Sequence, residues 1–185
     1  MRKLIYAINI TLDGCVDHTK FSPDEGLMDF YTNLIRGAGL LAYGRLTYDL
    51  MVPYWPDIAK KNKGETQADV EFARAFDSVE KVVFSKSLDK VEDKNSRIVR
   101  TKPEDEIHKL KQETGQDILL GGVALPTYLV DRSLVDEFMF VVHPVIVGGG
   151  RRLLEGINPQ QKLNLKLVDS KTSKLGSVAL HYAKR

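Results

Sequence analysis

The hydrophobic pattern of the first forty residues changes from one continuous apolar run to a helical period. The run from Lys3 to Ile10 predicts a buried strand, which ends at the turn signal Asp13-Gly14. A helix is expected to follow, because Ser22 suits its N-cap, Pro23 its first position and Glu25 its third. The apolar face of this helix consists of residues that recur at helical spacing, namely Leu27, Phe30, Tyr31, Leu34 and Ile35.

Strands and helices continue to alternate through the middle of the chain. Apolar, β-rich runs predict strands at Leu40–Tyr43, Lys81–Ser85, Arg97–Arg100 and Asp117–Leu120. Helical spacing predicts helices at Leu46–Met51, Ala68–Phe76, Pro103–Thr114 and along the segment that bears Leu125, Tyr128 and Leu129. The stretch from Pro53 to Gly64 is rich in prolines and polar residues, and we expect it to be a loop.

The C-terminal part of the chain contains three β-rich segments with no helix between them. They are Val135–Val147, the alternating Leu163, Leu165 and Leu167, and Val178–Tyr182. This succession predicts antiparallel strands at the C-terminus. Together with the earlier alternation, it predicts a single α/β domain over residues 1–185, in which a mixed sheet is covered by helices on both faces in three α/β/α layers.

Composition and charge narrow the classes of partner. The 185 residues include 27 Lys and Arg against 25 Asp and Glu, so the net charge is +2 and neither nucleic acid nor an anionic membrane is an expected partner. Cys15 is the only cysteine, which excludes an internal disulfide and makes a reducing cytoplasm the simplest location. No apolar run approaches the ~20 residues of a membrane helix.

The sequence contains one dinucleotide-like motif in an unsuitable context. Residues 37–42 read G-x-G-x-x-A, but these glycines follow a predicted helix and precede a strand, whereas a dinucleotide turn follows a strand and opens a helix. We therefore interpret this motif as an ordinary helix end. The four histidines are scattered without the spacing of metal ligands, so no metal site is expected.

Two other junctions have the order that phosphate binding requires. At Gly44-Arg45-Leu46-Thr47 and at Gly121-Gly122-Val123-Ala124, a buried strand is followed by glycine and then by a helix. Glycine allows the backbone N–H groups at the start of a helix to approach a phosphate closely. Glycine is also common between strands and helices for packing alone, so each junction by itself leaves both interpretations open.

Two further positions carry candidate polar chemistry. Ser85 and Lys86 at the end of the third strand are suited to an additional phosphate, or they are simply a solvated strand end. Asp29 lies off the apolar face of the first helix. It is either a charge that favours the start of that helix or a carboxylate that binds substrate.

The ordered set of motifs resembles the dihydrofolate-reductase-like family. The resemblance is greatest to the C-terminal reductase domain of the bifunctional riboflavin-biosynthesis deaminase/reductase. It covers nearly the whole chain, from Leu4 to Tyr182. The motifs that carry it are Leu12-Asp13-Gly14, Tyr43-Gly44-Arg45-Leu46-Thr47-Tyr48-Asp49, Val82-Val83-Phe84-Ser85-Lys86, Leu120-Gly121-Gly122, Leu134-Val135-Asp136-Glu137 and the segment from Pro144 to Gly150.

The resemblance implies an NADPH-dependent reductase of a small substrate that assembles as a homodimer. In that case Gly44, Arg45, Thr47, Gly121, Gly122, Val123 and Ala124 hold the pyrophosphate, Ala7 and Ile8 line the nicotinamide end, and Ser85 and Lys86 meet the adenosine-ribose phosphate. Asp29 lies close to the position of the carboxylate that holds the pterin in dihydrofolate reductases. The H-x-E and P-C-x-x-C signature of the deaminase is absent from the sequence. A nucleotide-binding protein without turnover is the alternative.

Overall fold

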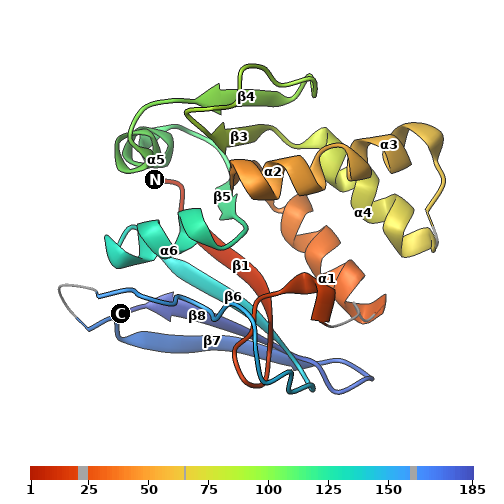
Figure 1. Ribbon diagram of the computed structural model, residues 1–185, viewed down its shortest axis with the longest axis vertical. Coiled ribbons are helices and arrows are strands. Elements are labelled where there is room, and N and C mark those ends of the chain that lie inside the picture. Colours follow the sequence, from red (N-terminus) through yellow and green to blue (C-terminus); the bar gives the residue numbers. More distant parts are fainter. Residues whose placement is uncertain (21–24, 65, 159–161) are drawn as a thin grey trace.

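One mixed sheet lies between two layers of helices in the computed structural model, which describes residues 1–20, 25–64, 66–158 and 162–185. Figure 1 shows its strands, which are β1 (Leu4–Thr11), β2 (Ala38–Gly44), β3 (Lys81–Phe84), β4 (Ser96–Val99), β5 (Asp117–Leu120), β6 (Glu137–His143), β7 (Leu165–Thr172) and β8 (Val178–Lys184). The helices are α1 (Glu25–Arg36), α2 (Arg45–Met51), α3 (Tyr54–Lys61), α4 (Gln67–Ser78), α5 (Pro103–Gln112) and α6 (Ala124–Asp131), with a 3-10 turn at His18–Lys20. The predicted α/β class is confirmed.

The strand order is β4-β3-β2-β5-β1-β6-β8-β7. The first six of these strands pair in parallel, whereas β8 pairs antiparallel with both β6 and β7. The prediction of antiparallel C-terminal strands is therefore confirmed. Because β1, β5 and β2 are parallel neighbours, the loops that follow them meet at one edge of the sheet.

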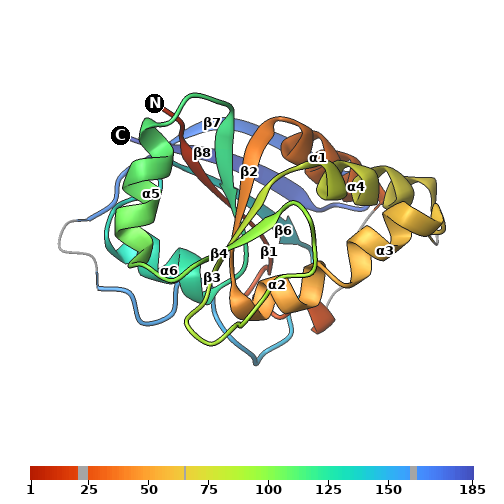
Figure 2. The ribbon, with the colours of Figure 1, turned by 90° about the horizontal axis from the view of Figure 1, so that it is seen from above.

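Residues of β1 alternate between the two faces of the sheet. Leu4 and Tyr6 belong to a core that is completed by α5 and α6, and Ile5 and Ala7 belong to a second core with α1 and α4. Figure 2 shows these two pairs of helices on opposite sides of the sheet. This alternation is the period of two that a strand covered on both faces requires. Within the described part of the chain, none of the helices has the length and apolarity needed to cross a membrane.

The first helix follows its predicted apolar face. Leu27 and Ile35 are 4% and 3% exposed, and the other members of the face are partly buried. The predicted cap residues Ser22 and Pro23 lie outside the described residues. The helix ends at Arg36 and β2 begins at Ala38, so residues 37–42 are a helix end followed by a strand, as predicted.

The prediction of a loop from Pro53 to Gly64 is wrong, because residues Tyr54–Lys61 form α3. Pro56 lies in the first turn of this helix, where backbone N–H groups have no partner within the helix and a proline removes no hydrogen bond. Asp57 and Lys61 form an ion pair at 2.7 Å across one turn. Prolines near a helix start were thus mistaken for prolines of a loop.

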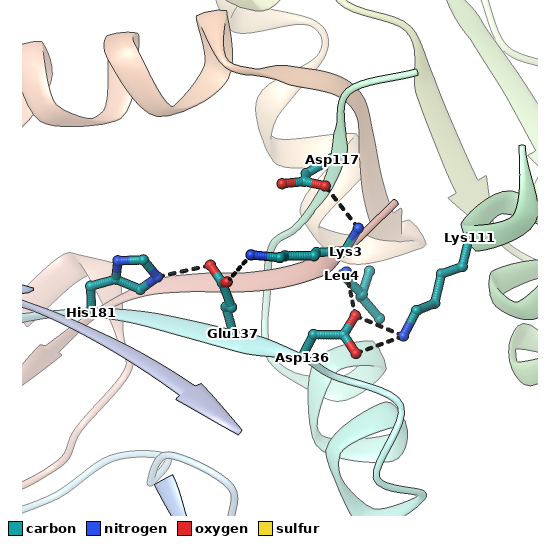
Figure 3. Close-up of polar contacts among 7 residues, drawn as sticks. All are labelled: Lys3, Leu4, Lys111, Asp117, Asp136, Glu137 and His181. Atoms are coloured by element: carbon teal, nitrogen blue, oxygen red, sulfur yellow. Dashed lines mark hydrogen bonds and ion pairs between the residues drawn. The ribbon is translucent and has the colours of Figure 1, made fainter. Parts of the chain in front are cut away.

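A polar network connects β1, β6 and β8 at the end of the sheet opposite to the loops that follow β1, β2 and β5 (Figure 3). Lys3 Nζ lies 2.6 Å from Glu137 Oε1, and His181 Nε2 lies 2.8 Å from Glu137 Oε2. The backbone N–H of Leu4 donates to Asp136 at 2.8 Å, and the ammonium group of Lys111 is paired with the same carboxylate. The network therefore fixes the start of β1 against the start of β6.

We expect the ionised carboxylate of Glu137 to stabilise the fold, so that part of the free energy of unfolding is lost at acidic pH. Burial alone raises the pKa of this carboxyl, but hydrogen bonds from Lys3 and His181 outweigh burial and bring the pKa below its ordinary 4.5. Its stabilising contribution is therefore present above pH 4.5 and is lost as the pH falls through the lower folded value. In urea unfolding between about pH 7 and pH 3, the free energy of unfolding should fall less with decreasing pH for Glu137→Gln than for the wild-type protein. Substitution of the exposed Glu80 by Gln is the control, and an equal effect of both variants would contradict this role.

Candidate functional site

Two adjoining cavities open where the loops after β1, β2 and β5 meet. The outer pocket has a volume of about 430 Å³ and the inner pocket about 260 Å³. Thr47, Leu50, Gly121 and Val123 line both of them, so the two pockets adjoin, and together they are called the cleft. Such a crevice outside the carboxyl ends of parallel strands is the usual ligand site of an open α/β sheet.

The outer pocket brings together the two strand-to-helix junctions that the sequence singled out. Gly44, Arg45 and Thr47 come from the first junction, and Gly121, Val123 and Ala124 from the second. No side chain caps the first turn of α2 or of α6. Arg151, from the segment after β6, adds a second guanidinium to the lining. The outer pocket therefore combines two helix starts with two cations, which suits an anionic group.

The glycine pair of the second junction fits tightly against the first junction. A Cβ placed on Gly121 would lie 2.5 Å from Tyr43 Cε1, and one on Gly122 would overlap the Thr47 hydroxyl oxygen. Gly122 also has a φ of +92°, and its carbonyl accepts a hydrogen bond from Tyr6 Oη at 3.1 Å. We predicted that glycine is needed here to leave space for a phosphate, whereas the side chains of Tyr43 and Thr47 already exclude a Cβ there.

The inner pocket is apolar and includes Ala7 and Ile8, as well as the backbone of Gly122. Its other walls come from α1, α2 and α4 and from the strands beneath them. They are formed by Asn9, Val16, Tyr31, Ile35, Tyr43, Met51, Phe72, Leu119 and Leu120. Among the described residues, no Asp, Glu, Lys, Arg or His contributes to this lining.

Asn9 joins three elements behind the inner pocket. Its side-chain oxygen accepts a hydrogen bond from Tyr31 Oη at 3.1 Å and lies 3.2 Å from His143 Nε2. Burial raises the pKa of Tyr31 well above its ordinary range, so its hydroxyl stays protonated as a donor. Sequence reasoning missed Asn9, although an amide in the middle of an otherwise apolar strand was an available signal.

Arg45 is fixed by neighbours on both sides. Its Nη1 donates to Ser87 Oγ at 2.8 Å, and its Nε donates to Asp49 at 3.2 Å. The Ser85 hydroxyl is 3.0 Å from the N–H of Leu88, from which it accepts, so it stabilises the turn after β3. Neither Ser85 nor the exposed Lys86 lines the outer or the inner pocket. Their contact with a further phosphate stays a prediction.

Asp29 lies in a different place from the cleft. The side chain is exposed on α1 and lines a separate cavity with the start of α4 and the β7–β8 turn, where Lys171 and Lys174 also lie. The structure therefore does not bring Asp29 to Ala7, Ile8 and the glycine junctions. Its catalytic role stays a prediction, and the proposals below do not depend on it.

Asp13 organises the loop that follows β1. Its carboxylate accepts hydrogen bonds from Thr11 Oγ1 at 2.6 Å and from the N–H of Gly148 at 2.9 Å, and pairs with Arg152 at 3.0 Å. Hydrogen bonds from Thr11 and Arg152 hold the pKa of Asp13 well below its usual range. The motif Leu12-Asp13-Gly14 is thereby joined to the glycine-rich segment from Pro144 to Gly150 at one end of the sheet.

Comparisons with known proteins agree with this architecture. The family model of the RibD C-terminal domain matches residues 2–179. The uncharacterized protein YyaP of Bacillus subtilis (strain 168) is 32% identical over 185 residues, which are 98% of this chain and 94% of YyaP. The uncharacterized protein YwjB of the same organism is 26% identical over 198 residues, which are 99% of this chain and 98% of YwjB.

Two solved structures show the same fold at low sequence identity. A putative riboflavin biosynthesis protein from Shewanella sp. PV-4 superposes with a TM-score of 0.73 at 18% identity, covering 99% of each chain. A diaminohydroxyphosphoribosylaminopyrimidine deaminase/5-amino-6-(5-phosphoribosylamino)uracil reductase from Thermotoga maritima gives a TM-score of 0.69 at 15% identity. That match covers 100% of this chain and 57% of the bifunctional protein.

Proposed function

The chain belongs to the RibD C-terminal domain family, and on this basis we propose that it is an NADPH-dependent reductase that transfers hydride to a small substrate. The family supports a reductase-like function related to riboflavin biosynthesis. The observation that carries the proposal is the cleft, in which a cationic outer pocket adjoins an apolar inner pocket. A dinucleotide needs both environments, one for its phosphates and one for its nicotinamide.

The residues of the outer pocket fit the pyrophosphate of NADPH. Two helix starts without side-chain caps present backbone donors, and Arg45 and Arg151 supply positive charge. The absence of side chains at Gly121 and Gly122 allows the second junction to lie against Tyr43 and Thr47. In this arrangement Gly44, Thr47, Val123 and Ala124 complete the phosphate-binding wall. Bound NADPH would supply the hydride for the reaction.

The protein's own contribution is positioning and the exclusion of water. Ala7 and Ile8 form one wall of the inner pocket, where the nicotinamide would lie. Apolar side chains from α1, α2 and α4 surround this space and keep water from the transferred hydride. Asn9, fixed by Tyr31, is the polar group of β1 at the same place.

Cofactor preference tests the proposal most directly. We expect NADPH to bind more tightly than NADH, because Lys86 and Ser85 lie beyond Arg45 and can meet the additional phosphate. Charge-assisted hydrogen bonds contribute about 1.5–3 kcal/mol each. In fluorescence titrations Lys86→Ala should weaken NADPH much more than NADH, and the exposed Lys109→Ala should change neither. Equal affinity of the wild-type protein for both cofactors would refute the roles of Ser85 and Lys86.

Turnover distinguishes a reductase from a protein of the same fold that only binds NADP. We expect NADPH absorbance at 340 nm, a property of the reduced nicotinamide ring, to fall when a small carbonyl or imine substrate is present. Tight NADPH binding without consumption across a broad panel of such compounds would favour the binding protein instead.

We also propose that the chain forms a homodimer through the free edge of the sheet. The strand β7 lies at this edge, and nearly all of its side chains are exposed. They include Leu167 and Val168, which are 49% and 53% exposed. Light scattering should give twice the chain mass of 20.8 kDa, and Leu167→Lys with Val168→Lys should give the monomer mass. A monomeric wild-type protein would contradict the proposal.

A further inference from the structure

We infer that the part of the substrate that lies against the nicotinamide in the inner pocket is an uncharged ring with a hydrogen-bond acceptor, and that the Tyr43 hydroxyl binds this acceptor. The inference rests on the proposed function, because it assigns the substrate class of the same cleft.

The first argument is the distribution of charge along the cleft. The described lining of the inner pocket has no charged side chain, whereas Arg45 and Arg151 both line the outer pocket. A phosphate or carboxylate in the inner pocket would lose its hydration without gaining a cation, which is strongly unfavourable. Anionic groups are therefore directed to the outer pocket, and the inner pocket is left for a neutral group.

The second argument is the environment of Tyr43 at the end of β2. Its side chain is 5% exposed, and its ring is stacked on Phe76 with centroids 6.3 Å apart. The ring edge lies against Gly121, because Tyr43 Cε1 and Cζ are 2.5 and 3.7 Å from where a Cβ on Gly121 would be. Both residues line the inner pocket. The absence of a side chain at Gly121 therefore allows this phenol to lie in the wall of the pocket.

The Tyr43 hydroxyl is available for a ligand. None of the hydrogen bonds found between described residues engages it, although the residue is almost completely buried. Burial raises the pKa of Tyr43 well above its ordinary range, so the hydroxyl stays neutral and can donate. A ligand acceptor would give this unengaged donor a hydrogen bond.

The Tyr31 and Thr47 hydroxyls of the inner pocket both have contacts within the protein. The Tyr31 hydroxyl donates to the Asn9 side-chain oxygen, and the Thr47 hydroxyl is packed against Gly122. The pocket volume of about 260 Å³ is at the small end for ligand sites. Ile35, Met51 and Phe72 add apolar walls from three different helices. A small planar ring system with a carbonyl or imine acceptor, lying against the nicotinamide, matches this combination.

A pair of probes of equal shape tests the inference by binding rather than by turnover. Naphthalene-2-carboxamide and naphthalene-2-carboxylate differ in charge at pH 7 but have the same ring and nearly the same size. We expect calorimetry on the full chain, with and without NADP+, to give at least tenfold tighter binding of the carboxamide. Equal or tighter binding of the carboxylate would overturn the inference.

Tyr43→Phe isolates the hydroxyl, because it preserves the ring that packs on Phe76 and Gly121. We expect carboxamide affinity to fall about tenfold, which corresponds to the loss of one hydrogen bond. Tyr48→Phe is the matched control. Tyr48 is also 5% exposed with an unpartnered hydroxyl, but it lines a separate cavity between α2, α3 and residues 87–93.

The outcomes separate this inference from the proposed function. Equal effects of Tyr43→Phe and Tyr48→Phe, or no effect of Tyr43→Phe in a folded variant, would overturn the assignment of Tyr43. The expected probe pattern without any NADPH binding would support the neutral pocket and refute the reductase. Normal NADPH binding with the opposite probe pattern would refute only the inference about the substrate class. Circular dichroism of each variant confirms its fold before the titrations are compared.

Discussion

Replacing Gly122 by alanine is expected to destabilise the protein more than the same replacement at Gly156. Both glycines have positive φ, +92° and +78°, so each alanine carries backbone strain of about 1–3 kcal/mol. The Cβ at Gly156 would have no atom within 4 Å, whereas the Cβ at Gly122 would overlap the Thr47 hydroxyl oxygen. Overpacking of this kind costs about a further 1–3 kcal/mol.

Urea unfolding of the two single variants measures the difference directly. Adding Thr47→Ala to Gly122→Ala should recover much of the excess loss, because the overlapping oxygen is removed. A Gly122→Ala variant no less stable than Gly156→Ala would contradict the observed contact. Under the proposed function, a folded Gly122→Ala variant should also bind NADPH weakly, since the second junction can no longer lie against the first. Normal NADPH binding by such a variant would place the cofactor elsewhere.

Removal of Asp93 is expected to cost about 3–5 kcal/mol, because it leaves a buried lysine without its counter-ion. Lys81 is 0% exposed, and its ammonium group lies 3.4 Å from Asp93, which is 6% exposed. The same ammonium donates to the carbonyl of Val79 at 2.9 Å and lies 4.8 Å from the centroid of the Phe76 ring. Those two contacts remain in Asp93→Ala but do not neutralise the charge.

The pH dependence of Asp93→Ala provides an independent check. Burial lowers the pKa of Lys81, and Asp93 opposes this effect in the wild-type protein. Without Asp93 the folded state binds the proton more weakly than the unfolded state, so the free energy of unfolding should rise as the pH increases toward 10.5. Lys81→Met should be far less damaging, since it removes the buried charge. A pH-independent loss in Asp93→Ala would argue against an unpaired lysine as the cause.

Local patterns predicted the parts of the fold that depend on neighbouring residues. The strand Asp117–Leu120 has the predicted bounds, because an apolar run between polar and glycine residues marks both ends. Two strand-to-helix junctions were also identified and line the same outer pocket. Their proximity follows from parallel strands, whose carboxyl ends lie at one edge of the sheet.

Features that depend on distant contacts could not be predicted in the same way. The helical period placed Asp29 off the apolar face of α1, but it does not say which element that side of the helix approaches, and the β7–β8 turn lies there. Asn9, Tyr31 and His143 meet only when β1, α1 and β6 are assembled. The Tyr43 ring similarly meets Gly121, which directly follows β5, only when β2 and β5 are paired.

The strand order has a consequence for biosynthesis. The strand β1 is made first, yet its two partners, β5 and β6, belong to the second half of the chain. The strands β2, β3 and β4 can pair with one another earlier, but β2 reaches β1 only through β5. While the ribosome is still translating the middle of the chain, the backbone edges of β1 lack their native partners and its apolar faces are uncovered, which favours self-association or chaperone binding. Insertion of β5 joins β1 to β2 and brings the two strand-to-helix junctions together, so a nascent chain acquires the cleft late in synthesis.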